Sequence, residues 1–242
     1  KNPNDAMENP SAALIKAVLM NGAQTNMNGV DNGRGNVAQV APYDNVIGFG
    51  RINLIKSLYI EGWSDVQAKV WDREVVEDGG LEEYAVTIDM SGGCTFSSLS
   101  VTLVWVEKAS FVGCSKCVVN DLDLKVIDPN GKTHYPNNKG KRDDTNNAER
   151  IVLGGVQDKT TYTFSVEGYN LDDASQSYAL VATGCFGGVK NQLDTSQDAF
   201  VTDNSSSDRT TTIIIVVCSV VGGILVLCLC GFFIKRRRAK QG

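Results

Sequence analysis

Histidine is almost absent from this sequence of 242 residues, since His134 is its only example. A Ser-His-Asp triad needs a histidine within hydrogen-bond reach of a nucleophile. His134 lies in a turn-and-strand region between Gly131 and Pro136, and no serine in a strained elbow is near it in the sequence. The chain is therefore expected to hold no catalytic residue, and His134 is interpreted as an ordinary surface histidine.

Basic residues are scarce ahead of the C-terminal end. All 28 acidic residues precede Ile213, whereas five of the 23 basic residues, Lys235–Arg238 and Lys240, follow Ile234. This excess of negative charge excludes nucleic acid as a partner and suits a cation-binding or simply soluble exterior. A charged-then-apolar leader is not visible at Lys1. Either the leader has been removed or the N-terminal part of the protein is missing, and the helix discussed below favours a missing part.

One long apolar run is present, and it predicts a membrane anchor. Ile213–Ile234 contains no charged residue and, as a helix, would span about 33 Å, against about 30 Å for the hydrocarbon core of a bilayer. The basic cluster behind it places the tail 235–242 in the cytosol and residues 1–212 outside. We therefore expect a single-pass protein of the plasma membrane or of a secretory-pathway membrane.

Apolar residues alternate with polar ones over most of the middle of the chain. This period of two, interrupted by turn residues such as Asp128-Pro129-Asn130-Gly131, predicts about eight short strands and an antiparallel β-sandwich, a jelly roll, over residues 63–186. Residues 187–212 are rich in Ser, Thr and Asp and predict an extended stalk. Asn204 begins a glycosylation sequon in that stalk. The expected strands contain Tyr84–Ile88, Leu99–Trp105, Leu122–Val126, Ile151–Leu153, Tyr162–Val166 and Tyr178–Ala182.

The first 62 residues differ from the rest because they predict helices. Asn9–Gly22 has helix-capping residues at both ends and is apolar nearly all round, so it must be buried on several sides. A short amphipathic helix follows, with Ile52, Ile55 and Leu58 on one side. No other part of the first 60 residues offers enough apolar surface to bury Asn9–Gly22. The domain that buries this helix is therefore expected to be missing, and the chain to be truncated.

Several stretches resemble subtilisin-like serine proteases. Asn9–Ala23 resembles the helix that ends the catalytic domain of that family, and Gly48–Asn53 resembles the turn that follows it. Leu103–Trp105, Asn120–Leu124, Asn146–Glu149 and Glu167–Asn170 resemble the C-terminal jelly roll of its alkaline-protease group. Kexin-type convertases share the order of domains.

The resemblance implies a domain plan and an activity for a parent protein. Residues 1–62 would be the end of an α/β catalytic domain, followed by the jelly roll, the stalk, the membrane helix 213–234 and the cytosolic tail. The parent would cleave protein or peptide substrates with a triad located upstream of Lys1. The fragment itself would be inactive, and its oligomeric state stays open.

Acidic and amide side chains gather at one expected end of the sandwich. Alternate side chains of a strand share a face, so Asp121 and Asp123 point one way and Leu122 and Leu124 the other. If successive strands run up and down, the loop 136–149 lies at the same end. Hard oxygen ligands suit Ca²⁺, and calcium is frequent in this domain of the resembled family. A solvated acidic rim is the alternative. The expected ligands are Asn120, Asp121, Asp123, Asp143, Asp144, Asn146, Asn147 and Glu149.

Four cysteines precede the membrane run. The same count of strands places Cys94 and Cys185 at one end of the sandwich and Cys114 and Cys117 at the other. We therefore expect the disulfides Cys94–Cys185 and Cys114–Cys117, with a Cys₄ zinc site as the alternative.

Two functions follow from these patterns. The first is the C-terminal part of a membrane-anchored subtilisin-like protease. The second is a calcium-dependent binding or adhesion receptor whose sandwich is the working part. The apolar helix Asn9–Gly22 favours the protease, because an independent module would not begin with it.

Overall fold

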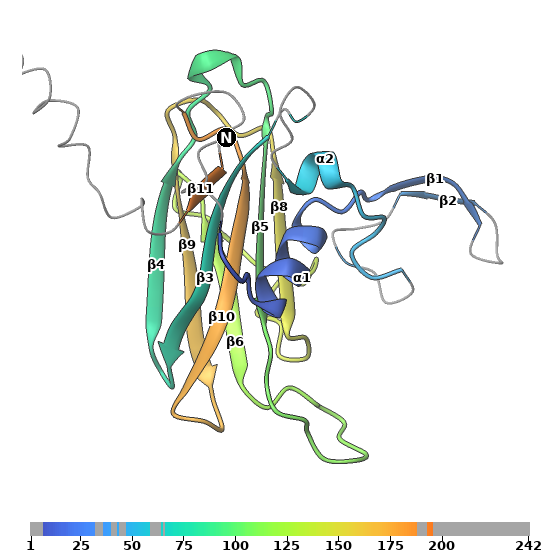
Figure 1. The fold of residues 1–242 in the computed structure, drawn as a ribbon, viewed down its shortest axis with the longest axis vertical. Coiled ribbons are helices and arrows are strands. Elements are labelled where there is room, and N and C mark those ends of the chain that lie inside the picture. The colour runs from blue at the N-terminus through green and yellow to red at the C-terminus, as the bar shows by residue number, and fades with distance from the viewer. Residues whose placement is uncertain are drawn as a thin grey trace, which may run out of the picture. The chain divides into compact units, whose positions relative to one another are not determined.

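The computed structural model describes residues 7–31, 36–39, 43, 47–58, 64, 66–187 and 193–195, and over these residues the protein is mainly β (Figure 1). Two helices, α1 (Ala12–Asn21) and α2 (Leu54–Ser57), precede most of the strands, and η2 (Ser91–Gly93) is a single 3₁₀ turn. The strands are β1 (Asn26–Asp31), β2 (Asn36–Gln39), β3 (Gln67–Glu77), β4 (Leu81–Thr87), β5 (Ser98–Trp105), β6 (Asp121–Ile127), β7 (Thr133–His134), β8 (Ala148–Gly154), β9 (Thr161–Asn170), β10 (Ser175–Gly184) and β11 (Leu193–Thr195).

The strands form a sandwich of two sheets, as the alternation predicts. One sheet has the order β11-β3-β10-β5-β8 and the other the order β4-β9-β6-β7, while β1 and β2 form a separate hairpin. Neighbouring strands of the sandwich are antiparallel, except that β11 runs parallel to β3. The sandwich therefore places the end of β5, the start of β6 and the start of β8 close to the loop 136–147, where the predicted ligands lie.

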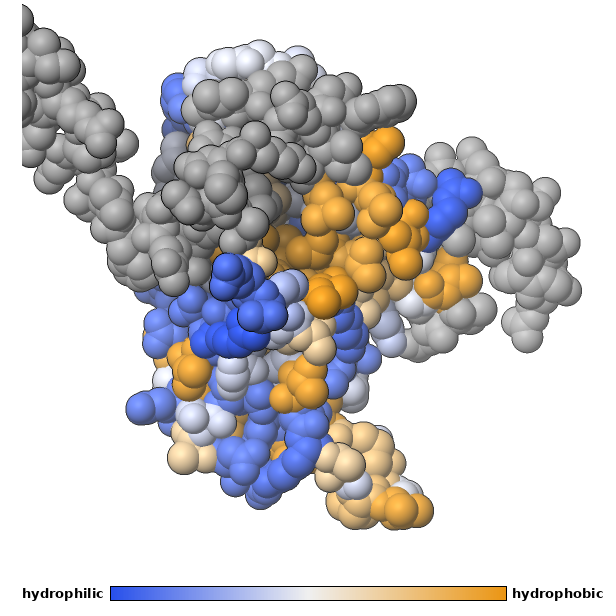
Figure 2. Space-filling view, viewed as in Figure 1, coloured by the Kyte–Doolittle hydropathy of each residue, from blue (hydrophilic) through white to orange (hydrophobic). Residues whose placement is uncertain are grey.

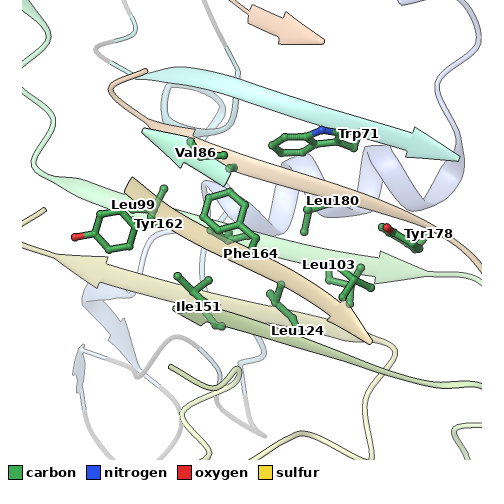
Figure 3. Packing of buried hydrophobic residues seen from close by; sticks show 14 of the residues in the cluster. Trp71, Val86, Leu99, Leu103, Leu124, Ile151, Tyr162, Phe164, Tyr178 and Leu180 are labelled. Carbon is green, nitrogen blue, oxygen red and sulfur yellow. The ribbon is translucent and has the colours of Figure 1, made fainter. Parts of the chain in front are cut away.

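The main core fills the space between the two sheets (Figure 3). Leu122 and Leu124 of β6 point into it together with Phe164 of β9, and Leu103 of β5 and Leu180 of β10 face them from the other sheet. Each of these side chains is fully buried. Burying a Leu or Phe side chain contributes about 1.5–3 kcal/mol, so this layer is the main source of the stability of the sandwich.

Helix α1 lies on the outer face of the five-stranded sheet and forms a second core there. Ser11 caps the helix through a hydrogen bond that its Oγ accepts from the Leu14 amide, and the Ser11 amide donates in turn to Asp72 Oδ2 of β3. The helix buries Leu14 and Ala17 against the sheet. Its partners there are Val70, Val104, Ala148, Ala179 and Val181, from four strands.

This packing corrects one part of the expectation, because the sandwich itself buries one side of the helix that the sequence analysis assigned to a missing body. The sandwich supplies one wall, because β5 and β10 are buried on both faces: every residue of β5 after Ser98 is buried, as is every residue of β10 after Ser177. Strands with two apolar faces accept a layer on each side. The side of α1 away from the sheet stays partly open, with Ile15 50% exposed.

Two disulfides join the cysteines in the expected pairs. Cys94 is bonded to Cys185 and Cys114 to Cys117. Cys94 and Cys185 lie in the main core, whereas Cys117 is exposed in the loop between β5 and β6. The first disulfide therefore cross-links two segments within the core of the sandwich, and the second closes a surface loop.

Part of the predicted stalk 187–212 belongs to the sandwich instead, because Leu193–Thr195 form β11 and pair with β3. Ile213–Ile234, the tail 235–242 and the sequon at Asn204 lie outside the described residues. Among the residues that are described, no helix has the length and apolar character needed to cross a bilayer.

Candidate functional site

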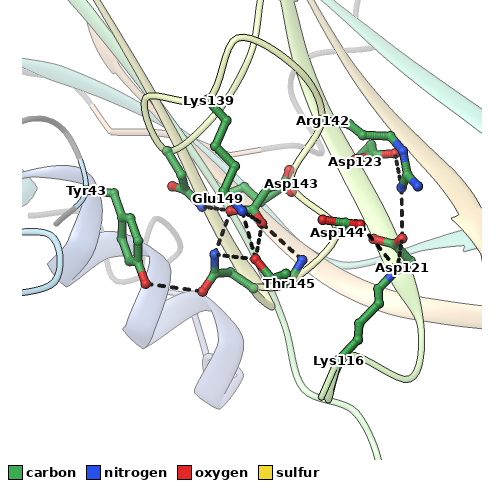
Figure 4. Close-up of polar contacts among 12 residues, drawn as sticks. Tyr43, Lys116, Asp121, Asp123, Lys139, Arg142, Asp143, Asp144, Thr145 and Glu149 are labelled. Atoms are coloured by element: carbon green, nitrogen blue, oxygen red, sulfur yellow. Dashed lines mark hydrogen bonds and ion pairs between the residues drawn. The ribbon is translucent and has the colours of Figure 1, made fainter. Parts of the chain in front are cut away.

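Carboxylates are brought together where the edges of the two sheets meet, between β6 and β8. Asp121 and Asp123 come from β6, Glu149 from β8 and Asp143 from the loop 136–147 (Figure 4). We call these four residues the acidic seam. All four are at most 1% exposed, so their charges are removed from water and each must be compensated by its neighbours.

Glu149 links the two sheets at this seam. Its Oε2 accepts a hydrogen bond of 2.6 Å from the Leu124 amide, on the edge of β6 that β7 leaves uncovered. The edge of β8 is covered by Asn137, whose Oδ1 accepts from the Arg150 amide at 3.0 Å and whose Nδ2 donates to the Ala148 carbonyl at 2.9 Å. Glu149 and Asn137 therefore satisfy backbone groups that an open sheet edge would leave without partners.

Asp121 and Asp123 face two basic side chains. Arg142 Nη1 lies 2.9 Å from Asp121 Oδ2 and 3.5 Å from Asp123 Oδ2. Lys116 Nζ donates to the same Asp121 oxygen at 3.0 Å and lies 3.9 Å from Asp144 Oδ2. Burial and the neighbouring charge of Asp121 together raise the pKa of Asp123 to about 6.

Asp143 forms a second group, separate from this pair. Burial alone would raise its pKa, but hydrogen bonds from Lys139, Asn137, Asn146 and Thr145 outweigh burial and hold the pKa at about 2. Both of its carboxylate oxygens accept hydrogen bonds. The charge of Asp143 is thus compensated by hydrogen bonds from its own loop, and these bonds also order the loop beside the other three acids.

Glu149 is the least compensated member of the seam. Burial, followed by the repulsion of the other seam carboxylates, raises its pKa well above the ordinary value. Within the described residues, its Oε1 has no hydrogen-bond partner, and the same is true of Asp121 Oδ1 and of both oxygens of Asp123. A carboxyl group in such surroundings holds its proton to a higher pH than in water.

The predicted calcium ligands do not converge on one point. Asn120 turns away, accepting from the Asp172 amide and donating to Gln176, and Asn147 accepts from Lys16. Asn146 contacts Asp143 and Tyr43. Over the described part of the chain, no three His, Cys, Asp or Glu side chains form a group that could hold a metal ion. The calcium site therefore stays a prediction.

The sequence analysis did not predict the basic residues that pair with the carboxylates of this site. Lys116, Lys139 and Arg142 each bind a seam carboxylate, but none of them belongs to a periodic pattern, because all three lie in loops. The position of Arg142 directly before Asp143 and Asp144 was the available signal, since an arginine beside a run of acids is suited to pair with them.

Replacing Glu149 by Gln is expected to stabilise the protein at pH 8 by about 1–2 kcal/mol. The unfolded chain releases the Glu149 proton near its ordinary pKa of 4.5, whereas the raised pKa lets the folded chain hold this proton to a higher pH, so stability falls as pH rises from 4.5 towards the folded-state pKa. Glutamine removes this loss and still accepts from the Leu124 amide. The gain should therefore shrink at pH 5, as measured by urea unfolding at both pH values.

Glu149→Ala is the matched comparison, because it leaves the Leu124 amide without its acceptor and should destabilise by about 2–3 kcal/mol. A Gln variant that is destabilised equally at pH 5 and pH 8 would contradict the raised pKa of Glu149.

A second polar cluster, on the outer face of the sandwich, fixes the N-terminal segment. Asn21, at the end of α1, donates from Nδ2 to Thr183 Oγ1 and accepts at Oδ1 from Thr102, both at 2.9 Å. Its carbonyl accepts from Ser100 Oγ at 3.0 Å. A buried amide whose donor and acceptor groups are both hydrogen-bonded favours one arrangement, so these bonds set the register of α1 on β5 and β10.

Arg150 of β8 completes this cluster. It is only 5% exposed, and its guanidinium donates to Ser100 Oγ at 3.2 Å and to the carbonyl oxygens of Ala23 and Phe49 at 3.1 and 3.5 Å. Burial lowers the pKa of Arg150 to about 10. We call Asn21, Ser100, Thr102, Arg150 and Thr183 the docking cluster.

Comparison with known proteins gives a similarity at the level of sequence. No family model matches the chain. Over 218 residues it is 24% identical to the serine protease/ABC transporter B family protein tagD of Dictyostelium discoideum, which covers 72% of this chain. The chain spans only 12% of the length of that relative. The chain is thus similar to part of a protein that is named a serine protease.

Solved structures share the β architecture only distantly. A mitogen from Yersinia pseudotuberculosis is 13% identical, with a TM-score of 0.31 over 51% of this chain and 88% of its own. A periplasmic inhibitor of g-type lysozyme from Aeromonas hydrophila is 11% identical, with a TM-score of 0.26 over 48% of this chain and 83% of its own. Neither likeness is strong enough to support a functional inference.

Proposed function

We propose that this chain is the C-terminal part of a membrane-anchored, subtilisin-like serine endopeptidase. In this proposal residues 1–62 end the catalytic domain, the sandwich is the jelly roll of the alkaline-protease group, and the triad belongs to a preceding segment. The parent would cleave protein or peptide substrates outside the cell or in a secretory compartment. The resemblance of Asn9–Ala23 and the serine protease similar to this chain support the assignment.

The observation that carries the proposal is the docking of α1 on the sandwich. The stretch that resembles the end of a catalytic domain is joined to the sheet by an apolar core and by the docking cluster. If this segment were a flexible linker between independent domains, Asn21 would not be buried against the sheet, and Arg150 of β8 would not be buried beneath the segment. The sandwich is therefore suited to hold the end of a catalytic domain in place.

The outer side of this segment offers a surface for the rest of such a domain. Large apolar side chains are exposed over α1 and α2, where Figure 2 shows a patch of hydrophobic residues. Monomeric proteins rarely leave large contiguous apolar patches in water, so a covering layer of protein suits this face. The exposed residues are Ile15, Ile52, Leu54, Ile55 and Leu58.

The proposal predicts a serine-directed label on the parent protein. The longest reading frame that contains this chain should be expressed in its native cells and treated with a fluorophosphonate probe, which reacts with an activated serine. One labelled polypeptide containing sandwich peptides is expected, and the label should disappear when the serine of its Gly-Thr-Ser stretch is replaced by alanine. The 242-residue chain alone, as the matched control, should stay unlabelled.

A reading frame that lacks a triad, or that places another β-sandwich before this one, would contradict the protease and favour a surface-binding protein instead.

A further inference from the structure

Arg142 lies at the place where two buried carboxylates of β6 converge (Figure 4). Its guanidinium is 2.9 Å from Asp121 Oδ2 and 3.5 Å from Asp123 Oδ2. On its other side it packs over the ring of Tyr169, with Cζ 3.6 Å from the ring centroid. An arginine held by two carboxylates and an aromatic face has little freedom left.

Lys116 brings a second positive charge to the same position. Its Nζ lies 3.0 Å from Asp121 Oδ2, the oxygen that Arg142 also contacts. Lys116 is a member of the short loop that the Cys114–Cys117 disulfide closes. The pair Asp121 and Asp123 therefore receives two positive charges from two different loops, which is the charge that one divalent cation would bring.

The carboxylates keep coordination capacity that the two cations do not use. Asp121 is 1% exposed and Asp123 0% exposed, while Asp121 Oδ1 and both oxygens of Asp123 accept no hydrogen bond from the described residues. Buried carboxylates that lose their cation are left with a large desolvation cost. Removing one positive group would thus leave hard oxygen donors facing a gap of about the size of a guanidinium.

From these contacts we propose that Arg142 takes the position that a calcium ion would hold, so that the sandwich needs no metal, and that removing the charge of Arg142 opens a divalent-cation site on Asp121 and Asp123. The calcium signal in the sequence then comes from carboxylates whose counter-ion is the protein's own arginine. This inference is independent of the proposed protease activity.

Calorimetry on the full 242-residue chain tests the proposal. The wild-type chain is expected to melt at the same temperature in EDTA and in millimolar Ca²⁺. The Arg142→Gln variant is expected to melt at a lower temperature in EDTA and to regain about 5 °C on addition of Ca²⁺. Arg142→Lys, which keeps the charge, is the matched control and should not respond to Ca²⁺.

The double variant Arg142→Gln, Asp123→Asn distinguishes a site on these carboxylates from calcium binding elsewhere, since it should lose the calcium response. A rise in the melting temperature of the wild-type chain with Ca²⁺ would overturn the proposal, and this measurement does not depend on whether any variant folds. A folded Arg142→Gln variant that fails to respond to Ca²⁺ would overturn it as well.

Discussion

Replacing both Cys94 and Cys185 by alanine is expected to lower the free energy of unfolding by about 4–5 kcal/mol. The two residues are 91 positions apart in the sequence, so their disulfide removes a large amount of conformational entropy from the unfolded chain. Both side chains also lie in the main core, and alanine would fill less of that space. Urea unfolding followed by circular dichroism measures the change.

The Cys114→Ala, Cys117→Ala double variant is the matched control. Its disulfide spans a separation of only 3 residues in an exposed loop, so its loss should cost about 2 kcal/mol or less. Equal effects of the two double variants would show that the Cys94–Cys185 bond does not hold the sandwich together.

Replacing Arg150 by alanine is expected to cost about 3 kcal/mol of stability, the second largest effect. The substitution removes the donor to the carbonyl oxygens of Ala23 and Phe49 and to Ser100. Buried acceptors that lose a charged donor carry their full desolvation penalty. The N-terminal segment should also loosen, which limited proteolysis after residue 20 would detect as faster cleavage.

Arg73→Ala is the comparison for this variant. Arg73 also contacts the N-terminal segment, donating to the Asn9 carbonyl at 2.7 Å, but its side chain is 57% exposed. Its loss should change the stability by about 1 kcal/mol or less. If Arg73→Ala destabilises as much as Arg150→Ala, the burial of the docking cluster does not set the energy of the interface.

The sandwich itself was predictable because its strands carry a clear period of two. Leu122 and Leu124 alternate with Asp121 and Asp123, and the structure places the leucines in the core. The same counting of strands predicted the partners of Cys94 and Cys185. Such patterns are local, and each strand displays its own inner face in its own sequence.

The partner of α1 was not predictable from the same pattern. The apolar sequence of the helix predicts that it is buried, but it does not identify the surface that buries it. The matching signal was in β5, where Val104 stands between the inward residues Leu103 and Trp105 and gives a strand that is apolar on both faces. A strand of this kind requires a layer on its outer side.

The acidic seam, a candidate functional site, shows the same limit. The acids could be grouped because strand direction brings 120–123 and 136–149 to one end. The basic side chains that pair with these acids could not be predicted, because the partner of a long basic side chain depends on the conformation of its loop. In the structure Lys116 and Arg142 pair with Asp121, and Arg142 also lies beside Asp123, in a set of acids whose sequence pattern resembles a metal site.

The central claim, that α1 belongs to the cooperative unit of the sandwich, is tested most directly by amide hydrogen exchange on the full 242-residue chain. A helix of 10 residues is too short to be stable alone in water, so slow exchange in α1 reports its docking. The amides of Ala17 and Val18 are expected to exchange within about tenfold of the rate of Leu180 in β10. Exchange of these α1 amides at the rate of an unstructured peptide, while Leu180 stays protected, would contradict the account.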